Sequence, residues 1–208
     1  MTPHEATDPD APGHDRAIAE TRAWVRRAVI GLNLCPFARG VDVKNQIRYV
    51  VTDAADPEAL LTALVEELQR LADTDPDTVD TTLLIHPQVL QDFRDFNDFL
   101  ELADAAVEEL GLDGVLQVAS FHPQFQFADT DPDDITNATN RSPYPTLHLL
   151  REDSVDRAVA AFPTADAIFE NNMRTLENLG LEGWSTLREQ WEQDAAEEAA
   201  AARAKRQA

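Results

Sequence analysis

Four short hydrophobic runs, separated in part by amphipathic helical patterns, constrain the fold of this 208-residue chain most strongly. They predict strands at 47–52, 81–85, 115–121 and 146–150. A helical pattern separates the first strand from the second and the second from the third, and a long loop separates the third from the fourth. Strands that alternate with helices are typical of α/β folds, in which crossover connections leave successive strands parallel. We therefore predict an α/β fold: a small two- or three-layer sandwich with a four-stranded, largely parallel sheet. A ferredoxin-like variant is the alternative.

The helical patterns carry recognisable start and stop signals. The first helix is expected at 15–34, where Pro36 helps to stop it. Asp56 and Pro57 predict the start of the second helix, because an aspartate caps the helix and a proline suits its first turn. A long helix with one apolar stripe ends at Gly111. After the fourth strand, we expect helices at 154–162 and 164–180 and a helical segment from Trp184 onward.

The two ends of the chain differ in composition from its middle. Residues 1–14 are rich in proline and aspartate, which predicts a disordered N-terminal tail. Residues 15–182 are expected to form a single α/β domain, since a chain of this length buries about 70% of its unfolded surface. Residues 183–208 are predicted to be a helical tail rich in alanine and glutamate.

Charge excludes two classes of partner. The chain has 17 Lys and Arg against 39 Asp and Glu, and its formal net charge is −22. Such an acidic protein repels phosphate backbones and anionic lipids, so we expect no nucleic-acid or membrane binding. The sequence also has no apolar run of the roughly 18 residues that a membrane-spanning helix needs, and no signal-peptide pattern. We expect a cytoplasmic protein, whose oligomeric state the sequence leaves open.

The segment 119–152 concentrates the residues that could carry chemistry. It holds two of the five histidines, an internal arginine (Arg141), two asparagines and an acidic turn. A loop of this length inside a compact domain is usually either functional or disordered, and the aromatic residues and prolines here do not suit disorder. We therefore place the functional site in this segment.

Histidines follow two of the predicted strands at the same relative position. The second strand ends in His86-Pro87 and the third in His122-Pro123. If these strands are parallel, both imidazoles emerge at one edge of the sheet, where open α/β sheets usually bind ligands. The alternative is that each imidazole caps its strand end by local hydrogen bonds. His148 lies within the fourth strand, and it is either a satisfied core histidine or a third group facing the pocket.

Arg141 is the candidate anchor for a ligand. Its planar guanidinium can bind a carboxylate or phosphate through two hydrogen bonds, and Asn137 and Asn140 lie one helical turn apart beside it. Tyr144, between two prolines, is expected to pack over the site as a lid. The alternative is that Arg141 forms a salt bridge with the nearby aspartates and holds the loop in place.

Other site chemistry is weakly indicated. Cys35 lies at the end of the first predicted helix, where the helix dipole raises a thiol pKa, so we expect a packed, unreactive thiol. The alternative is a cysteine nucleophile against which a histidine folds back. The sequence contains no spaced metal-ligand motif, glycine-rich phosphate loop or serine nucleophile elbow, and it therefore specifies neither a metal nor a cofactor.

Three motifs together resemble a bacterial family, domain-of-unknown-function family 1415. They are Gly-Leu-Asn-Leu-Cys-Pro-Phe-Ala at 31–38, Phe-His-Pro-Gln-Phe-Gln-Phe at 121–127, and Asp-Ile-Thr-Asn-Ala-Thr-Asn-Arg-Ser-Pro-Tyr-Pro-Thr-Leu-His-Leu-Leu-Arg-Glu at 134–152. The resemblance covers roughly residues 16–182 and implies no particular reaction. It places these candidate residues within the distinctive motifs: Cys35, His122, Asn140, Arg141 and His148.

These observations predict a small cytoplasmic enzyme that acts on a polar or anionic small molecule. His122 would be the general acid/base, assisted by His86 or His148, or the three histidines would hold a divalent metal that activates water. The substrate would be bound by Arg141, Asn137, Asn140 and Tyr144. The alternative is a non-enzymatic module that binds a small molecule or a protein through the same loop.

Overall fold

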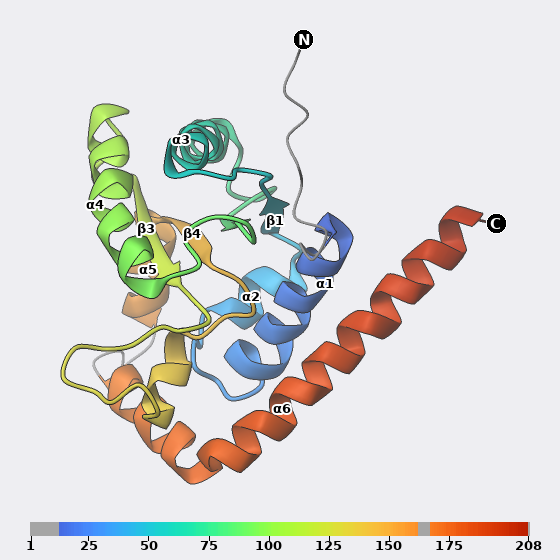
Figure 1. Ribbon diagram of the computed structural model, residues 1–208. Coiled ribbons are helices and arrows are strands. Elements are labelled where there is room, and N and C mark those ends of the chain that lie inside the picture. Colours follow the sequence, from blue (N-terminus) through green and yellow to red (C-terminus); the bar gives the residue numbers. More distant parts are fainter. Residues whose placement is uncertain (1–12, 162–166, 208) are drawn as a thin grey trace.

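The computed structural model describes residues 13–161 and 167–207, so the predicted N-terminal tail and the predicted helix boundary near 162–164 lie almost wholly outside it (Figure 1). Its centre is one sheet of four strands: β1 (Ile47–Val51), β2 (Thr81–Ile85), β3 (Leu116–Phe121) and β4 (Thr146–Arg151). Helices cover both faces of this sheet, which gives three layers. The predicted α/β class is confirmed, with four strands at the predicted positions.

The order of the strands departs from the prediction of a largely parallel sheet. The order is β1-β2-β4-β3, in which β1 and β2 are parallel while β4 is antiparallel to both of its neighbours. The strands β1, β2 and β3 do run in one direction, but β4 inserts between β2 and β3 and makes two of the three pairings antiparallel. The succession β-α-β-α-β-β also differs from the ferredoxin-like β-α-β-β-α-β, which corrects that alternative.

One face of the sheet is covered by α3 (Pro57–Asp73) and α4 (Phe93–Glu109). The predicted cap of α3 is confirmed, because the Asp56 side chain accepts a hydrogen bond of 2.8 Å from the Ala59 N–H and Pro57 begins the helix. Asp92 caps α4 in the same way, accepting from Arg94 N at 2.8 Å. The leucines of α3 and the phenylalanines of α4 form the larger hydrophobic core with β2, β3 and β4.

The other face is covered by α1 (His14–Trp24), the π-helical turn η1 (Val25–Ile30) and α6 (Ile168–Gln207). Trp24 of α1 packs edge-on against Phe121 of β3, with ring centroids 5.2 Å apart. The long helix α6 bends at Gly180, whose φ is 67°, and its second part runs beside α1 (Figure 1). Trp191 and Ala195 of this second part are buried in the core that α1 forms.

Three short helices complete the fold. They are α2 (Ala38–Val43), the 3₁₀ helix η2 (Ile135–Asn140) and α5 (Glu152–Ala161), which begins two residues before its predicted start. A search of the helices within 13–161 and 167–207 finds no candidate membrane span.

The first helix ends earlier than predicted, because it widens into a π-helical turn at Val25 and stops at Ile30. Gly31 follows this turn, and a Cβ atom added there would lie 2.1 Å from the carbonyl oxygen of Arg27. Only glycine allows the backbone to come so close, which explains why the chain can turn sharply here toward Cys35.

We expect Gly31→Ala to lower the free energy of unfolding by about 2 kcal/mol, because the added methyl group forces the backbone apart. Gly40→Ala is the matched control, since a Cβ atom at Gly40 meets nothing within 4 Å in the helix α2. The control should be neutral or stabilising by up to about 1 kcal/mol. Urea denaturation of both variants measures the difference, and equal stabilities would refute the close-approach argument.

Candidate functional site

The structure places His86 and His122 at the same edge of the sheet. The strands β2 and β3 run in one direction, and each histidine directly follows its strand. Their rings both pack against Phe96 of α4, at centroid distances of 5.6 and 5.1 Å. The backbone N–H of each histidine bonds to the returning loop, at Pro145 O for His86 and at Asn140 O for His122. The paired His-Pro motifs therefore form one buried aromatic cluster.

Backbone groups occupy most of the imidazole nitrogens in this cluster. Nδ1 of His86 lies 3.0 Å from Val89 O, while its Nε2 is buried without a partner among the described residues. Nδ1 of His122 accepts a hydrogen bond of 3.0 Å from Gln124 N, so Nε2 carries the proton that is donated to Leu90 O at 3.2 Å. Burial lowers the pKa of His86 to about 4 and also lowers the pKa of His122. Both rings are neutral near pH 7, and these contacts match strand-end capping.

His148 is not part of this cluster. In β4 it alternates with Leu147 and Leu149, which belong to the core beneath α3 and α4, so its side chain lies on the opposite face of the sheet. Its Nε2 lies 2.7 Å from the hydroxyl of Thr81, and burial lowers its pKa to about 4. The three histidines therefore do not converge. No group of three potential metal-binding side chains occurs in the described part of the chain either.

Asn137 holds the long loop together. Its side chain is fully buried, and its Oδ1 accepts hydrogen bonds of 2.9 Å from Phe127 N and from the Thr130 hydroxyl. Its Nδ2 donates to Asp131 O at 2.9 Å. Asn140 acts similarly by donating to Ser120 O at 3.3 Å. Both amides were expected to bind substrate, but in this structure Asn137 bonds to loop residues and Asn140 bonds to the backbone of β3.

We expect Asn137→Ala to lower the free energy of unfolding by about 2 kcal/mol, because it leaves buried backbone and hydroxyl groups without partners. The cost stays moderate because the loop borders solvent, and water can replace part of the lost bonding. Asn97→Ala in α4, where the side chain is exposed, is the control and should change stability by less than about 0.5 kcal/mol. Thermal unfolding that gives both variants the same stability would show that Asn137 does not organise the loop.

Arg141 connects two parts of this loop by donating hydrogen bonds to their backbone carbonyls. Its Nε donates to Phe125 O at 3.1 Å and one Nη2 hydrogen to Pro132 O at 2.6 Å. Arg141 forms no ion pair within 4.0 Å with a carboxylate of the described residues. Carbonyl contacts thus take the place of the salt bridge to the aspartates that was the alternative expectation. Within the same residues, Nη1 has no hydrogen-bond acceptor.

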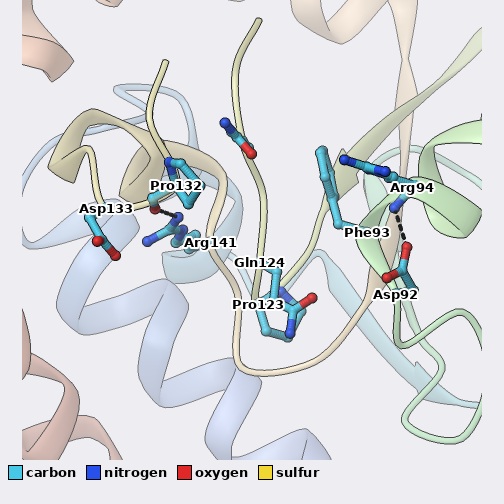
Figure 2. Close-up of a pocket in the computed structure, with 9 residues that line it drawn as sticks. Asp92, Phe93, Arg94, Pro123, Gln124, Pro132, Asp133 and Arg141 are labelled. Atoms are coloured by element: carbon cyan, nitrogen blue, oxygen red, sulfur yellow. Dashed lines mark hydrogen bonds between the residues drawn. The ribbon is translucent and has the colours of Figure 1, made fainter. Parts of the chain in front are cut away.

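Arg141 lines a surface cavity of about 440 Å³ that we call the arginine hollow. Figure 2 shows Arg141, Pro132 and Asp133 on one side of it and Asp92, Phe93 and Arg94 on the other, with Pro123 and Gln124 between them. The ring centroids of Phe93 and His122 lie 5.5 Å apart, so the histidine cluster adjoins the side of the hollow that Phe93 lines. The complete lining consists of Asp92, Phe93, Arg94, Pro123, Gln124, Gln126, Pro132, Asp133 and Arg141.

Tyr144 lies in a neighbouring cavity of about 330 Å³, the tryptophan hollow. Its hydroxyl donates a hydrogen bond to the Glu20 carboxylate of α1, and burial together with Glu20 raises the pKa of Tyr144. Tyr144 is therefore tied to α1, and it lines the tryptophan hollow and not the arginine hollow. The complete lining consists of Glu20, Pro123, Arg141, Ser142, Pro143, Tyr144, Trp184, Arg188, Trp191 and Glu192.

Cys35 follows the turn after η1 and is partly buried against the core formed by α1. Burial raises its thiol pKa, and the backbone N–H groups of Phe37 and Ala38 offset part of that rise. The direction is the one that we predicted, although burial and not the helix dipole is its main cause. A raised pKa disfavours the thiolate and thus supports a packed, unreactive thiol.

A family model described as a protein of unknown function, domain-of-unknown-function family 1415, matches residues 16–186. The chain belongs to this family. The segment matched to the family includes every residue that lines the arginine hollow, but it ends within α6 before Arg188 and Trp191. No curated protein and no solved structure matches the chain.

Proposed function

We propose that the protein binds a small anionic molecule in the arginine hollow, with Arg141 as its principal contact. The observation that carries this proposal is the way in which Arg141 is held. Two of its donors are fixed by Phe125 O and Pro132 O, while Nη1 has no acceptor among the described residues. A guanidinium positioned in advance loses little conformational freedom when it binds a carboxylate or phosphate.

The charges around the hollow support the same proposal. In a protein of net charge −22, an anion needs a local positive site, and the hollow is lined by both Arg94 and Arg141. Of the two aspartates in the lining, Asp92 is already engaged as the cap of α4. The exposed amide of Gln124 adds groups that can bond to further polar atoms of the ligand.

Binding is better supported than histidine-based catalysis. A general base at His122 would need a free imidazole nitrogen, but both of its nitrogens are bonded to backbone groups. His86 has a free Nε2, yet its side chain is fully buried and it does not line the arginine hollow. An enzymatic role would require Gln124 to release Nδ1 of His122 when the ligand binds, and we keep this as the second candidate function.

The proposal is tested by isothermal titration with acetate and with inorganic phosphate. Arg141→Ala should weaken binding roughly 10- to 100-fold, as expected for lost charge-assisted hydrogen bonds, and Arg141→Lys should weaken it less. Arg94→Gln is a second variant whose exposed side chain makes its folding defect small. Arg174→Gln in α6, which lines neither hollow, is the control.

The contrary result is also specific. If Arg141→Ala melts far below the parent protein and neither anion binds to the parent, Arg141 is only a clamp for the loop. Unchanged affinity in both Arg94→Gln and a folded Arg141→Ala would likewise reject the arginine hollow as the site.

A further inference from the structure

The two hollows adjoin each other, because Arg141 and Pro123 line both of them. We propose that the ligand is an aromatic anion, whose negative group lies on Arg141 and whose planar ring lies against Trp184 in the tryptophan hollow. This inference rests on the proposed function, and it adds the chemical class of the ligand and a second set of contacts.

Three aromatic side chains line the tryptophan hollow. Trp184 and Trp191 pack edge to face with their ring centroids 5.4 Å apart, and Tyr144 lines the same cavity. Trp191 is only 4% exposed, whereas Trp184 is partly exposed. The buried ring thus supports the partly exposed one, which leaves a rigid aromatic surface for a planar group to pack against.

The helix that carries these residues is fixed in place. Trp184, Arg188 and Trp191 follow one another at helical spacing, so they share one face of α6. An ion pair of 2.6 Å between Arg27 and Asp194 joins that part of α6 to η1. Ala195 of the same part is buried in the core that α1 forms. The side of the hollow that α6 forms is therefore in place without a ligand.

The charges in the tryptophan hollow favour an anion over an organic cation. Aromatic residues beside carboxylates can also bind amines, but the carboxylates here are already engaged. Glu20 accepts hydrogen bonds from Arg16, at 2.7 Å, and from Tyr144, while Glu192 lies 3.2 Å from Arg188. The formal charges of the lining balance, but Arg141 is its cation without an ion pair within 4.0 Å among the described residues, so Arg141 is the charged group left for a ligand.

The test compares each anion with its aromatic counterpart on the full chain. We expect benzoate to bind at least about 10-fold more tightly than acetate, and phenyl phosphate more tightly than inorganic phosphate, because the ring adds contact with Trp184. In ¹H–¹⁵N spectra, benzoate should shift the indole N–H signal of Trp184, and acetate should not.

Two substitutions at Trp184 distinguish the contribution of an aromatic ring from that of side-chain size. Trp184→Leu should reduce the preference for benzoate over acetate to about twofold or less, while Trp184→Phe should keep most of it. Because Trp184 also contacts the core, the folding of both variants is checked by thermal unfolding, and the indole shift in the parent does not depend on either variant.

The outcomes distinguish this inference from the proposed function. If benzoate and acetate bind equally well and Arg141→Ala weakens both, the aromatic inference is overturned while the anion site stands. If no anion binds to the parent protein, both are overturned.

Discussion

Replacing Arg151 by alanine should lower the free energy of unfolding by about 4 kcal/mol, the largest effect that we expect for a single substitution. Arg151 is 8% exposed at the end of β4, and its Nη2 donates to Leu71 O and Thr74 O at 2.6 Å and to Val79 O at 3.1 Å. These carbonyls lie at the C-terminal end of α3 and in the loop that leads to β2. The guanidinium caps α3 and ties it to the sheet, so truncation leaves several carbonyls without a donor.

Urea denaturation of three variants measures this effect. Arg151→Lys should recover part of the loss, because an ammonium can still reach some of the carbonyls but lacks the planar geometry of the guanidinium. Arg174→Ala, at an exposed position in α6, should cost less than about 0.5 kcal/mol. A cost for Arg151→Ala as small as that of Arg174→Ala would show that the capping contacts contribute nothing.

The cost of replacing His86 by glutamine should shrink by about 3 kcal/mol as the pH falls from about 7.5 to about 4. The pKa of His86 is lowered from its ordinary value of 6.5 to about 4 in the folded protein. Between these two values the unfolded chain binds a proton that the folded chain does not, so acidification destabilises the parent. The His86→Gln variant lacks this loss, and its stability therefore approaches that of the parent at low pH.

Chemical denaturation of the parent and of His86→Gln at several pH values tests this expectation. The comparison is made between variants because many carboxylates titrate in the same range and affect both proteins alike. Asn97→Ala, which removes no titratable group, should follow the parent at every pH. A cost of His86→Gln that stays constant with pH would show that the imidazole is not held in its neutral form.

Local signals in the sequence predicted the elements well, because their causes are local. Asp56 caps α3 as expected, since an aspartate before a first-turn proline satisfies the free N–H groups of the helix through its own side chain. The position of β4 between β2 and β3 has no such local cause, because it depends on which strand edges remain free after the chain has folded. The π-helical turn before Gly31 was also missed, since six residues are too few to distinguish its periodicity from that of an α-helix.

The sequence predicted where the paired histidines lie in the fold, but it did not predict the hydrogen-bond partners of the candidate residues. The sequence correctly predicted that His86 and His122 lie at one edge of the sheet, because the direction of the strands follows from the crossover helices. The partners of His122 and Asn137 are backbone atoms of the loops, and a sequence does not reveal which backbone atoms a side chain reaches. Arg94 was missed because it resembles an ordinary surface residue in the first turn of a helix, and only the fold places it opposite Arg141.

The most direct test of the central claim is a titration of the ¹⁵N-labelled protein with inorganic phosphate, followed through the signals of Arg94, Gln124 and Arg141. These residues line the arginine hollow from three different segments of the chain. We predict saturable shifts at these signals in the parent protein, and we expect these shifts to disappear in Arg141→Ala. Saturable shifts of the same size in a folded Arg141→Ala, or no saturable shift at the hollow in the parent, would contradict the central claim.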